Sequence, residues 1–193
     1  MTQKPTPTPT MTRPLHAPSH VQGMSRLLAP ACTALIFLLP IVVAGYWMLE
    51  DAGSLAVRSA ALAPDAVVAP LATWQRVVGA LLTEVALLPL LIGLWQARRC
   101  FVQFASGQIF TMFAAQCLKR FAGWSLVSVL AGIVTTTALS VLITLHNPPG
   151  FRHLAIGVGT DQVFFAFFAG MVWLMAAVIG EGQALAEENA TFI

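Results

Sequence analysis

Two acidic residues lie inside long apolar stretches, and they are the first candidates for chemistry in this chain. Glu84 is the only charged residue between positions 76 and 98, and Asp161 is the only one between positions 152 and 181. An ionised side chain at the centre of a membrane helix costs about 2.5–3.5 kcal/mol on insertion scales. Glu84 is therefore expected to be protonated or paired inside the protein.

These two carboxylates each allow two interpretations. Glu84 is either a proton-titratable or cation-binding group, or a protonated acid bonded to a hydroxyl of Thr135, Thr136 or Thr137. Asp161 is either a second intramembrane carboxylate or an ordinary residue at the outer interface. Both acids are expected in the outer half of the membrane. Whether their side chains lie close to each other is left open by the sequence.

A second set of candidates lies in the polar connection around residues 98–123 and in the C-terminal tail. Gly107 tolerates positive φ and is expected to end one helix, and Thr111 is expected to cap a short amphipathic helix, Met112–Arg120. This helix is either an ordinary interfacial connection or a docking surface for a cytoplasmic partner. The candidate interaction surface consists of Arg98, Arg99, Gly107, Phe110, Thr111, Lys119, Arg120, Glu187 and Glu188.

Small residues recur every four positions further along the chain. These are Ser128, Gly132, Thr136 and Ser140. A stripe of small residues lets two membrane helices approach closely and lets hydroxyls bond between them. The stripe is expected to pack within the protein, and a homodimer face is the alternative.

The elements that position these residues are four long apolar stretches bounded by charges. Each reaches about the 20 residues that an α-helix needs to cross a bilayer, and a lipid-exposed backbone must be helical to satisfy its hydrogen bonds. The sequence predicts an all-α integral membrane protein with spans at about 27–49, 77–95, 124–145 and 156–179, and the short amphipathic helix between the second and third. Residues 24–193 form this membrane domain, whereas the Pro- and Thr-rich residues 1–23 are expected to be disordered. Met11 and Met24 are alternative translation starts.

Charge distribution predicts the orientation of the chain. Of ten Lys and Arg residues, seven lie in the N-terminal tail and the second connection, and three lie in the other two connections. Because cytoplasmic loops are enriched in Lys and Arg, both termini are expected in the cytoplasm of a bacterium, with the protein in its inner membrane.

The composition and the absence of certain motifs argue against several classes of protein. Only 9% of residues are charged, against about 25% in a typical soluble domain. A net charge of +2 is too small to predict nucleic-acid binding. The chain has no nucleophile elbow, HExxH motif or phosphate-binding glycine loop. We therefore expect no enzyme activity, no catalytic residues, no cofactor and no metal site.

Parts of the second connection and the tail resemble a known bacterial family. The matching pieces are Phe104, Gly107-Gln108-Ile109-Phe110-Thr111, Leu118, Gly123, Ala184-Leu185-Ala186-Glu187-Glu188-Asn189 and Phe192-Ile193. They resemble the membrane family "domain of unknown function 2975". The resemblance implies a four-span protein over residues 25–193 with no established reaction. Some members are similar in setting to proteins encoded beside helix-turn-helix regulators, which implies a regulator as partner.

Two functional hypotheses follow. The first is a non-enzymatic signalling or interaction partner of a cytoplasmic regulator, with the lipid bilayer as its other partner. The alternative is a small transporter or proton-coupled permease that uses Glu84; because four spans are few for a transporter, this hypothesis requires a homo-oligomer.

Overall fold

The computed structural model describes residues 19–67, 70–107, 112–148, 150–152 and 154–191. Its long helices are α1 (Ser19–Leu49), α3 (Thr73–Ala105), α4 (Met112–Thr144) and α5 (Thr160–Thr191). A short helix α2 (Ala52–Ala60) and a 3-10 turn η1 (Pro64–Ala66) separate α1 from α3. All four long helices are long and apolar enough to cross a membrane, and the described residues contain no strand. The predicted all-α membrane fold is confirmed.

Helix boundaries differ from the predicted ones mainly by extension. The apolar segments that could span a membrane run Gln22–Leu49, Thr73–Ala105, Met112–Thr144 and Thr160–Leu185. Helix α1 already begins at Ser19, inside the tail predicted to be disordered, and residues 1–18 of that tail lie outside the described residues. Helix α5 begins at Thr160 rather than near 156. Once a helix is nucleated, each further residue adds one hydrogen bond, so it continues past the membrane boundary until a residue breaks it.

The predicted position of the short helix is wrong. Met112–Arg120 is the first part of α4, which continues without a break to Thr144. The separate short helix is α2, between the first and second spans. Asp51 begins it by accepting a hydrogen bond from the Ser54 backbone N–H at 3.0 Å, and Ala61 ends it in the left-handed conformation at φ 52°. A capped start and a left-handed end define a helix, and no comparable break follows Arg120.

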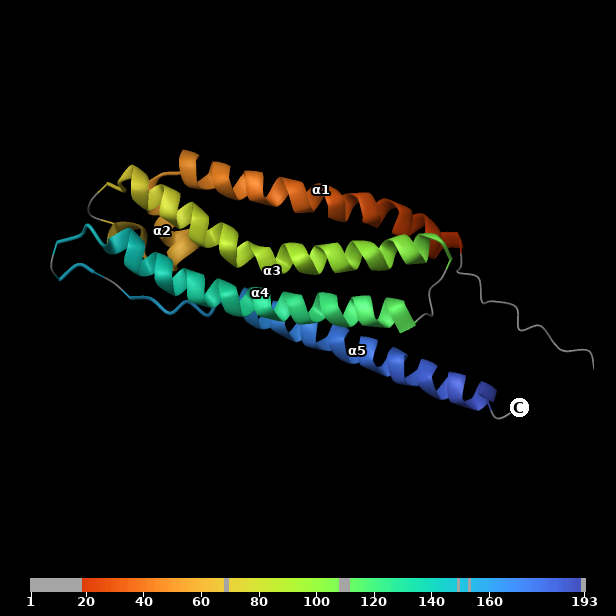
Figure 1. Cartoon of the computed structure of the whole chain (residues 1–193). Helices are drawn as coiled ribbons and strands as arrows, with labels where there is room; N and C mark the ends of the chain where they lie inside the picture. The colour runs from red at the N-terminus through yellow and green to blue at the C-terminus, as the bar shows by residue number, and fades with distance from the viewer. Residues whose placement is uncertain (1–18, 68–69, 108–111, 149, 153, 192–193) are drawn as a thin grey trace, which may run out of the picture.

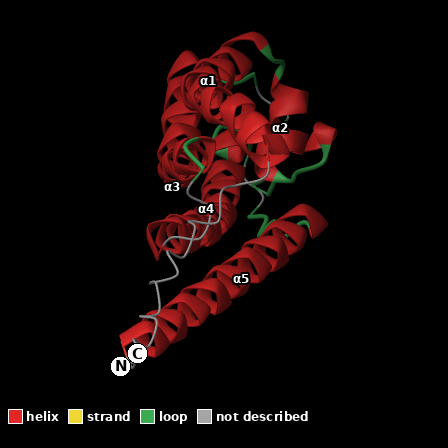
Figure 2. Ribbon diagram, turned by 90° about the vertical axis from the view of Figure 1, so that its right-hand side faces the viewer, coloured by secondary structure: helices red, strands yellow, loops and turns green. Residues whose placement is uncertain are grey.

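Each long helix runs antiparallel to the long helix that precedes it in the chain (Figure 1). Among the described residues, substantial packing between long helices is confined to α1 with α3, α3 with α4, and α4 with α5. Helix α5 therefore packs mainly on α4 and diverges from the other helices, as Figure 2 shows.

The two ends of the molecule differ in character. One end combines the start of α1, the α3–α4 connection and the end of α5 (Figure 1). We call it the basic end, because it carries Arg26, Arg98, Arg99, Lys119 and Arg120. The opposite end combines α2, η1 and the segment 145–159, and we call it the capped end.

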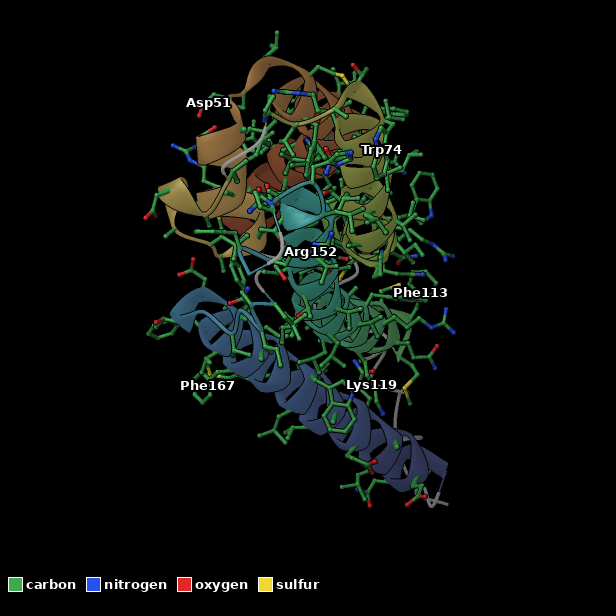
Figure 3. All side chains as sticks on the ribbon, turned by 90° about the vertical axis from the view of Figure 1, so that its left-hand side faces the viewer. Asp51, Trp74, Phe113, Lys119, Arg152 and Phe167 are labelled. Carbon is green, nitrogen blue, oxygen red and sulfur yellow. The ribbon has the colours of Figure 1, made fainter. Side chains whose placement is uncertain are left out.

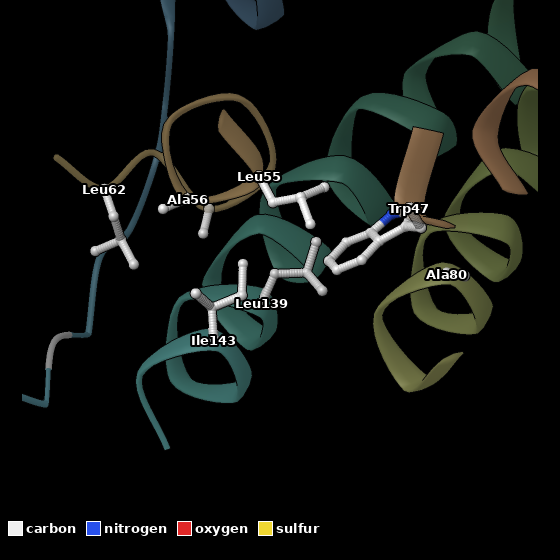
Figure 4. Close-up of a cluster of buried hydrophobic side chains, with 8 residues drawn as sticks. Trp47, Leu55, Ala56, Leu62, Ala80, Leu139 and Ile143 are labelled. Carbon is white, nitrogen blue, oxygen red and sulfur yellow. The ribbon is translucent and has the colours of Figure 1, made fainter. Parts of the chain in front are cut away.

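A hydrophobic cluster closes the capped end. Helix α2 lays Leu55, Ala56 and Ala60 against side chains of α1, α3 and α4 (Figure 4). The other members of this cluster are Trp47, Leu62, Ala80, Leu139 and Ile143. The apolar face of α2 packs mainly on α4, and the shared cluster connects it to side chains of α1 and α3.

Polar side chains satisfy the helix ends around this cluster. Arg76 donates to the carbonyls of Trp47 and Glu50 at 3.1 and 2.8 Å, which are among the carbonyls that the end of α1 leaves unpaired. Gln75, only 1% exposed, donates to the Leu142 carbonyl at 2.7 Å and so ties the start of α3 to α4. Asn147 donates to the carbonyls of Ala66 and Phe151 at 2.7 and 2.8 Å, which joins the two connections of this end.

Candidate functional site: the basic end

Three cationic side chains at the basic end lie against aromatic rings. The guanidinium of Arg98 lies 5.4 Å from the ring centre of Trp95, and that of Arg99 lies 5.2 Å from Phe113. The ammonium of Lys119 lies 4.9 Å from the ring centre of Trp173 on α5. Figure 3 labels Phe113 and Lys119 on α4. Aromatic residues and cations are typical of the membrane–water interface, so these pairs mark its level at this end.

Gly107 ends the second span as predicted. Helix α3 stops at Ala105, Ser106 caps it, and Gly107 has φ +89°. A side chain at Gly107 would be strained by that φ and would also meet the Gln22 amide at 3.2 Å, so the position favours glycine. The predicted roles of Phe110 and Thr111 fall outside the described residues.

A groove between α4 and α5 opens at the basic end. Lys119 contributes from α4 and Glu181 from α5. Small residues form most of its α5 wall, and the full lining is Met112, Ala115, Gln116, Lys119, Ala176, Ala177, Gly180, Glu181 and Ala184. Since the first residue of α4 lies level with residues 180–184, the last turns of α5 extend beyond the start of α4 (Figure 1).

Gln183 precedes the groove residue Ala184 in the sequence, does not itself line the groove, and was missed by sequence reasoning. Its amide oxygen and nitrogen are both buried, and neither has a hydrogen-bond partner among the described residues. The available signal was its position within the run of small residues at 176, 177, 180 and 184, where a polar amide is exceptional. Of the predicted acidic residues beyond it, Glu188 is exposed, and the side chain of Glu187 lies outside the described part of the chain.

Glu84 is half-buried on α3, and none of the three threonines predicted as its partners forms a hydrogen bond with it. Among the described residues no hydrogen bond or ion pair reaches its carboxylate. The Thr137 hydroxyl instead donates to the Ile133 carbonyl at 3.0 Å within α4. Thr136 faces Gly157, because a Cβ at that glycine would lie 2.9 Å from its methyl group.

Asp161 lies in the first turn of α5 and is exposed. It borders a shallow groove with Phe164, Phe165, Phe167, Phe168 and Met171. Phe167, 70% exposed, projects away from α5 (Figure 3). Acidic residues are favoured near a helix start by the helix dipole, so the position itself accounts for an acidic residue at 161. Because α5 packs on α4 and not substantially on α3, the structure does not bring Asp161 and Glu84 together.

The stripe of small residues on α4 faces α5 and the segment before it. Ser128 and Gly132 line an apolar groove of about 340 Å³ with residues of α3 and α5. Thr136 contacts Gly157, and the fully buried Ser140 hydroxyl accepts a hydrogen bond from the Ala155 backbone N–H at 3.0 Å. Thr136 and Ser140 therefore contact the segment before α5, whereas Ser128 and Gly132 border open space and a Cβ at Gly132 would meet nothing within 4 Å.

The cysteines offer no ligand cluster. Cys100 and Cys117 are buried between α3 and α4, and the Cys100 thiol donates to the Ala114 carbonyl at 3.9 Å. In the part of the chain that the structure describes, no three His, Cys, Asp or Glu residues gather closely enough to hold a metal ion.

These features define a multi-pass helical membrane protein with an asymmetric pair of ends. Residues 60–193 match the model of the family described as "Protein of unknown function (DUF2975)", and the chain belongs to this family. No curated protein and no solved structure matches the chain.

Proposed function

We propose that this protein is a non-enzymatic component of the bacterial inner membrane that binds a cytoplasmic regulatory protein through the α4–α5 groove. In this proposal the basic end faces the cytoplasm, in line with the enrichment of Lys and Arg in cytoplasmic loops. The observation that carries the proposal is a groove walled by small residues of α5, with Lys119 on its α4 side and Glu181 on its α5 side.

A partner segment seated in the groove would lie between Lys119 on α4 and Glu181 on α5. The small residues of α5 allow the backbone of such a segment to approach closely. Lys119 and Glu181 on opposite walls would select a segment with complementary charges.

Site-specific photo-crosslinking in living cells tests this proposal. A photoreactive amino acid replaces Gln116 in the groove, and a matched probe replaces Gly182, which is exposed on α5 and is not among the lining residues. We expect a cytoplasmic protein to crosslink at 116 and not at 182. The crosslink should disappear with Lys119→Glu and persist with Arg58→Glu, a like charge change at the capped end.

Crosslinks confined to lipid or to a second copy of this chain would contradict the proposal. So would a protein crosslink at 116 that is insensitive to Lys119→Glu, because the groove charges would then have no part in selecting the partner.

A second candidate function is proton-coupled transport by an oligomer of this chain. The half-buried carboxylate of Glu84, without a partner in the described chain, favours it, since unpaired intramembrane acids commonly mark ion or proton pathways. Reconstituted Glu84→Gln protein should then lose proton-coupled flux. If flux is absent from the wild type, or unchanged in the variant, this function is contradicted.

A further inference from the structure

Arg98 is fixed in place at the basic end, in the groove between α1 and α3. Its Nε donates a hydrogen bond to the Thr33 hydroxyl oxygen at 2.8 Å. The Thr33 hydroxyl in turn donates to the Ala29 carbonyl at 3.2 Å. The guanidinium also lies 5.4 Å from the Trp95 ring centre. Most interfacial arginines are free to extend toward water, whereas contacts on two sides hold this one in the groove.

The positive charge of Arg98 has no counter-ion in the described protein. No carboxylate among the described residues lies within ion-pair distance of it, and Glu84 is fourteen residues earlier on the same helix, about 21 Å away along its axis. Removing a charge from water is costly unless the charge is paired. A guanidinium has five N–H donors in a planar fork, and the Nη donors that remain match the oxygens of a phosphate.

The surface beside Arg98 is apolar and leads into the membrane. The groove has a volume of about 400 Å³ and is lined by Ala29, Pro30, Thr33, Ala34, Phe37 and Arg98. From Ala29 to Phe37 it follows α1 for eight residues, or about 12 Å along the helix axis. Small side chains and a proline leave it open, and Phe37, 68% exposed, forms its deeper wall.

We propose that this groove binds one anionic glycerophospholipid, with its phosphate on Arg98 and an acyl chain along Ala34 and Phe37. A cation at the headgroup level followed by an apolar groove of this length matches the phosphate and the acyl chain of such a lipid, whereas a soluble phosphate would use only the cation. The site lies on α1 and α3, so it is separate from the α4–α5 groove and does not depend on the protein-binding function.

Native mass spectrometry of the full chain in detergent tests the site. The protein is mixed with phosphatidylglycerol or phosphatidylcholine of identical acyl chains, and the lipid-bound fraction is measured. We expect wild type to retain one phosphatidylglycerol at least fivefold more than phosphatidylcholine. Arg98→Gln should lower the retained phosphatidylglycerol at least fivefold.

Arg99→Gln is the matched control. It removes one positive charge from the neighbouring residue, which stacks on Phe113 outside the groove, and it should change retention less than twofold. Thr33→Val, which removes the oxygen that anchors Arg98, should lower retention without changing the charge and serves if Arg98→Gln does not fold.

Three results would overturn the proposal. One is equal loss in the Arg98 and Arg99 variants, since charge alone would then explain retention. Another is equal retention of the two lipids by wild type. The third is full displacement of phosphatidylglycerol by an equal concentration of glycerol 3-phosphate, which would show that the acyl chain contributes nothing.

Discussion

At the scale of single residues, the Trp47 ring packs against α3 at Gly79. The indole N–H donates to the Thr83 hydroxyl oxygen at 3.0 Å, and that hydroxyl donates to the Gly79 carbonyl at 2.9 Å. The ring lies flat enough on α3 that a Cβ at Gly79 would stand 2.3 Å from it. Glycine at position 79 is therefore what allows α1 and α3 to meet at the capped end.

Gly79→Ala should destabilise the protein by about 1–3 kcal/mol, the usual range for overpacking a tight contact. Gly45→Ala in α1 is the matched control, because a Cβ there meets nothing within 4 Å. The comparison is the thermal unfolding midpoint in one detergent. Adding Trp47→Leu to Gly79→Ala should recover part of the loss; equal midpoints for the two alanine variants would refute the close contact.

Residue types alone predicted some local conformations and not others. Gly107 was predictable as a helix end because glycine is the residue that readily adopts positive φ. The lack of a hydrogen-bond partner for Gln183 among the described residues was not predictable, because it depends on which groups the neighbouring helix places beside the amide. The same holds for Glu84, whose three predicted threonine partners lie on another helix, one of them bonded within that helix and another packed against Gly157.

At the scale of elements, the long helices were predictable and the short one was not. Charges at the ends of each apolar stretch located the spans, because lipid exposure leaves the backbone no other conformation. Helix α2 has only nine residues, and its buried face, Leu55, Ala56 and Ala60, is two-thirds alanine. The burial of that face depends on packing against α4, which the local sequence does not reveal, so the amphipathic pattern at 112–120 was the stronger signal.

The Asp51 cap should make the position of α2 sensitive to acid. The hydrogen bond from the Ser54 backbone N–H, followed by the contribution of the Ser54 side chain, lowers the pKa of the Asp51 carboxyl below its usual range. A carboxyl whose pKa is lower in the folded than in the unfolded state stabilises the fold above its unfolded pKa. That stabilisation is lost as the pH falls through the folded-state pKa.

We expect the thermal midpoint of wild type to fall between pH 6 and about pH 3 more steeply than that of Asp51→Asn, whose amide oxygen still caps but does not titrate. Asp51→Ala should be less stable than Asp51→Asn at every pH, since it removes the acceptor. Parallel pH profiles for wild type and Asp51→Asn would show that the carboxylate does not contribute through ionisation.

At the scale of the whole molecule, the two ends differ in how their polar side chains are paired. The capped end uses its polar side chains internally, on helix termini and between connections, as Arg76, Gln75 and Asn147 do. The basic end instead leaves polar groups without partners in the described chain, among them the Gln183 amide. An end that is satisfied internally suits a closed surface, and one with unpaired groups suits binding. Because four spans return the chain to its starting side, the start of α1 and the end of α5 share the basic end (Figure 1).

This asymmetry predicts that the basic end faces the cytoplasm, and the positive-inside rule predicts the same orientation. A cysteine replacing Asp65, exposed in η1 at the capped end, should react with a membrane-impermeant maleimide on intact spheroplasts. A cysteine replacing Glu188, exposed near the end of α5, should react only after the membrane is opened. The native Cys32, Cys100 and Cys117 are each at most 6% exposed, so their background reaction should be low. If position 188 were labelled on intact spheroplasts and position 65 only after the membrane is opened, the orientation would be the opposite of the predicted one. It would then place the α4–α5 groove outside the cytoplasm and remove the basis for a cytoplasmic regulator as partner, while leaving the lipid site on Arg98 testable by itself.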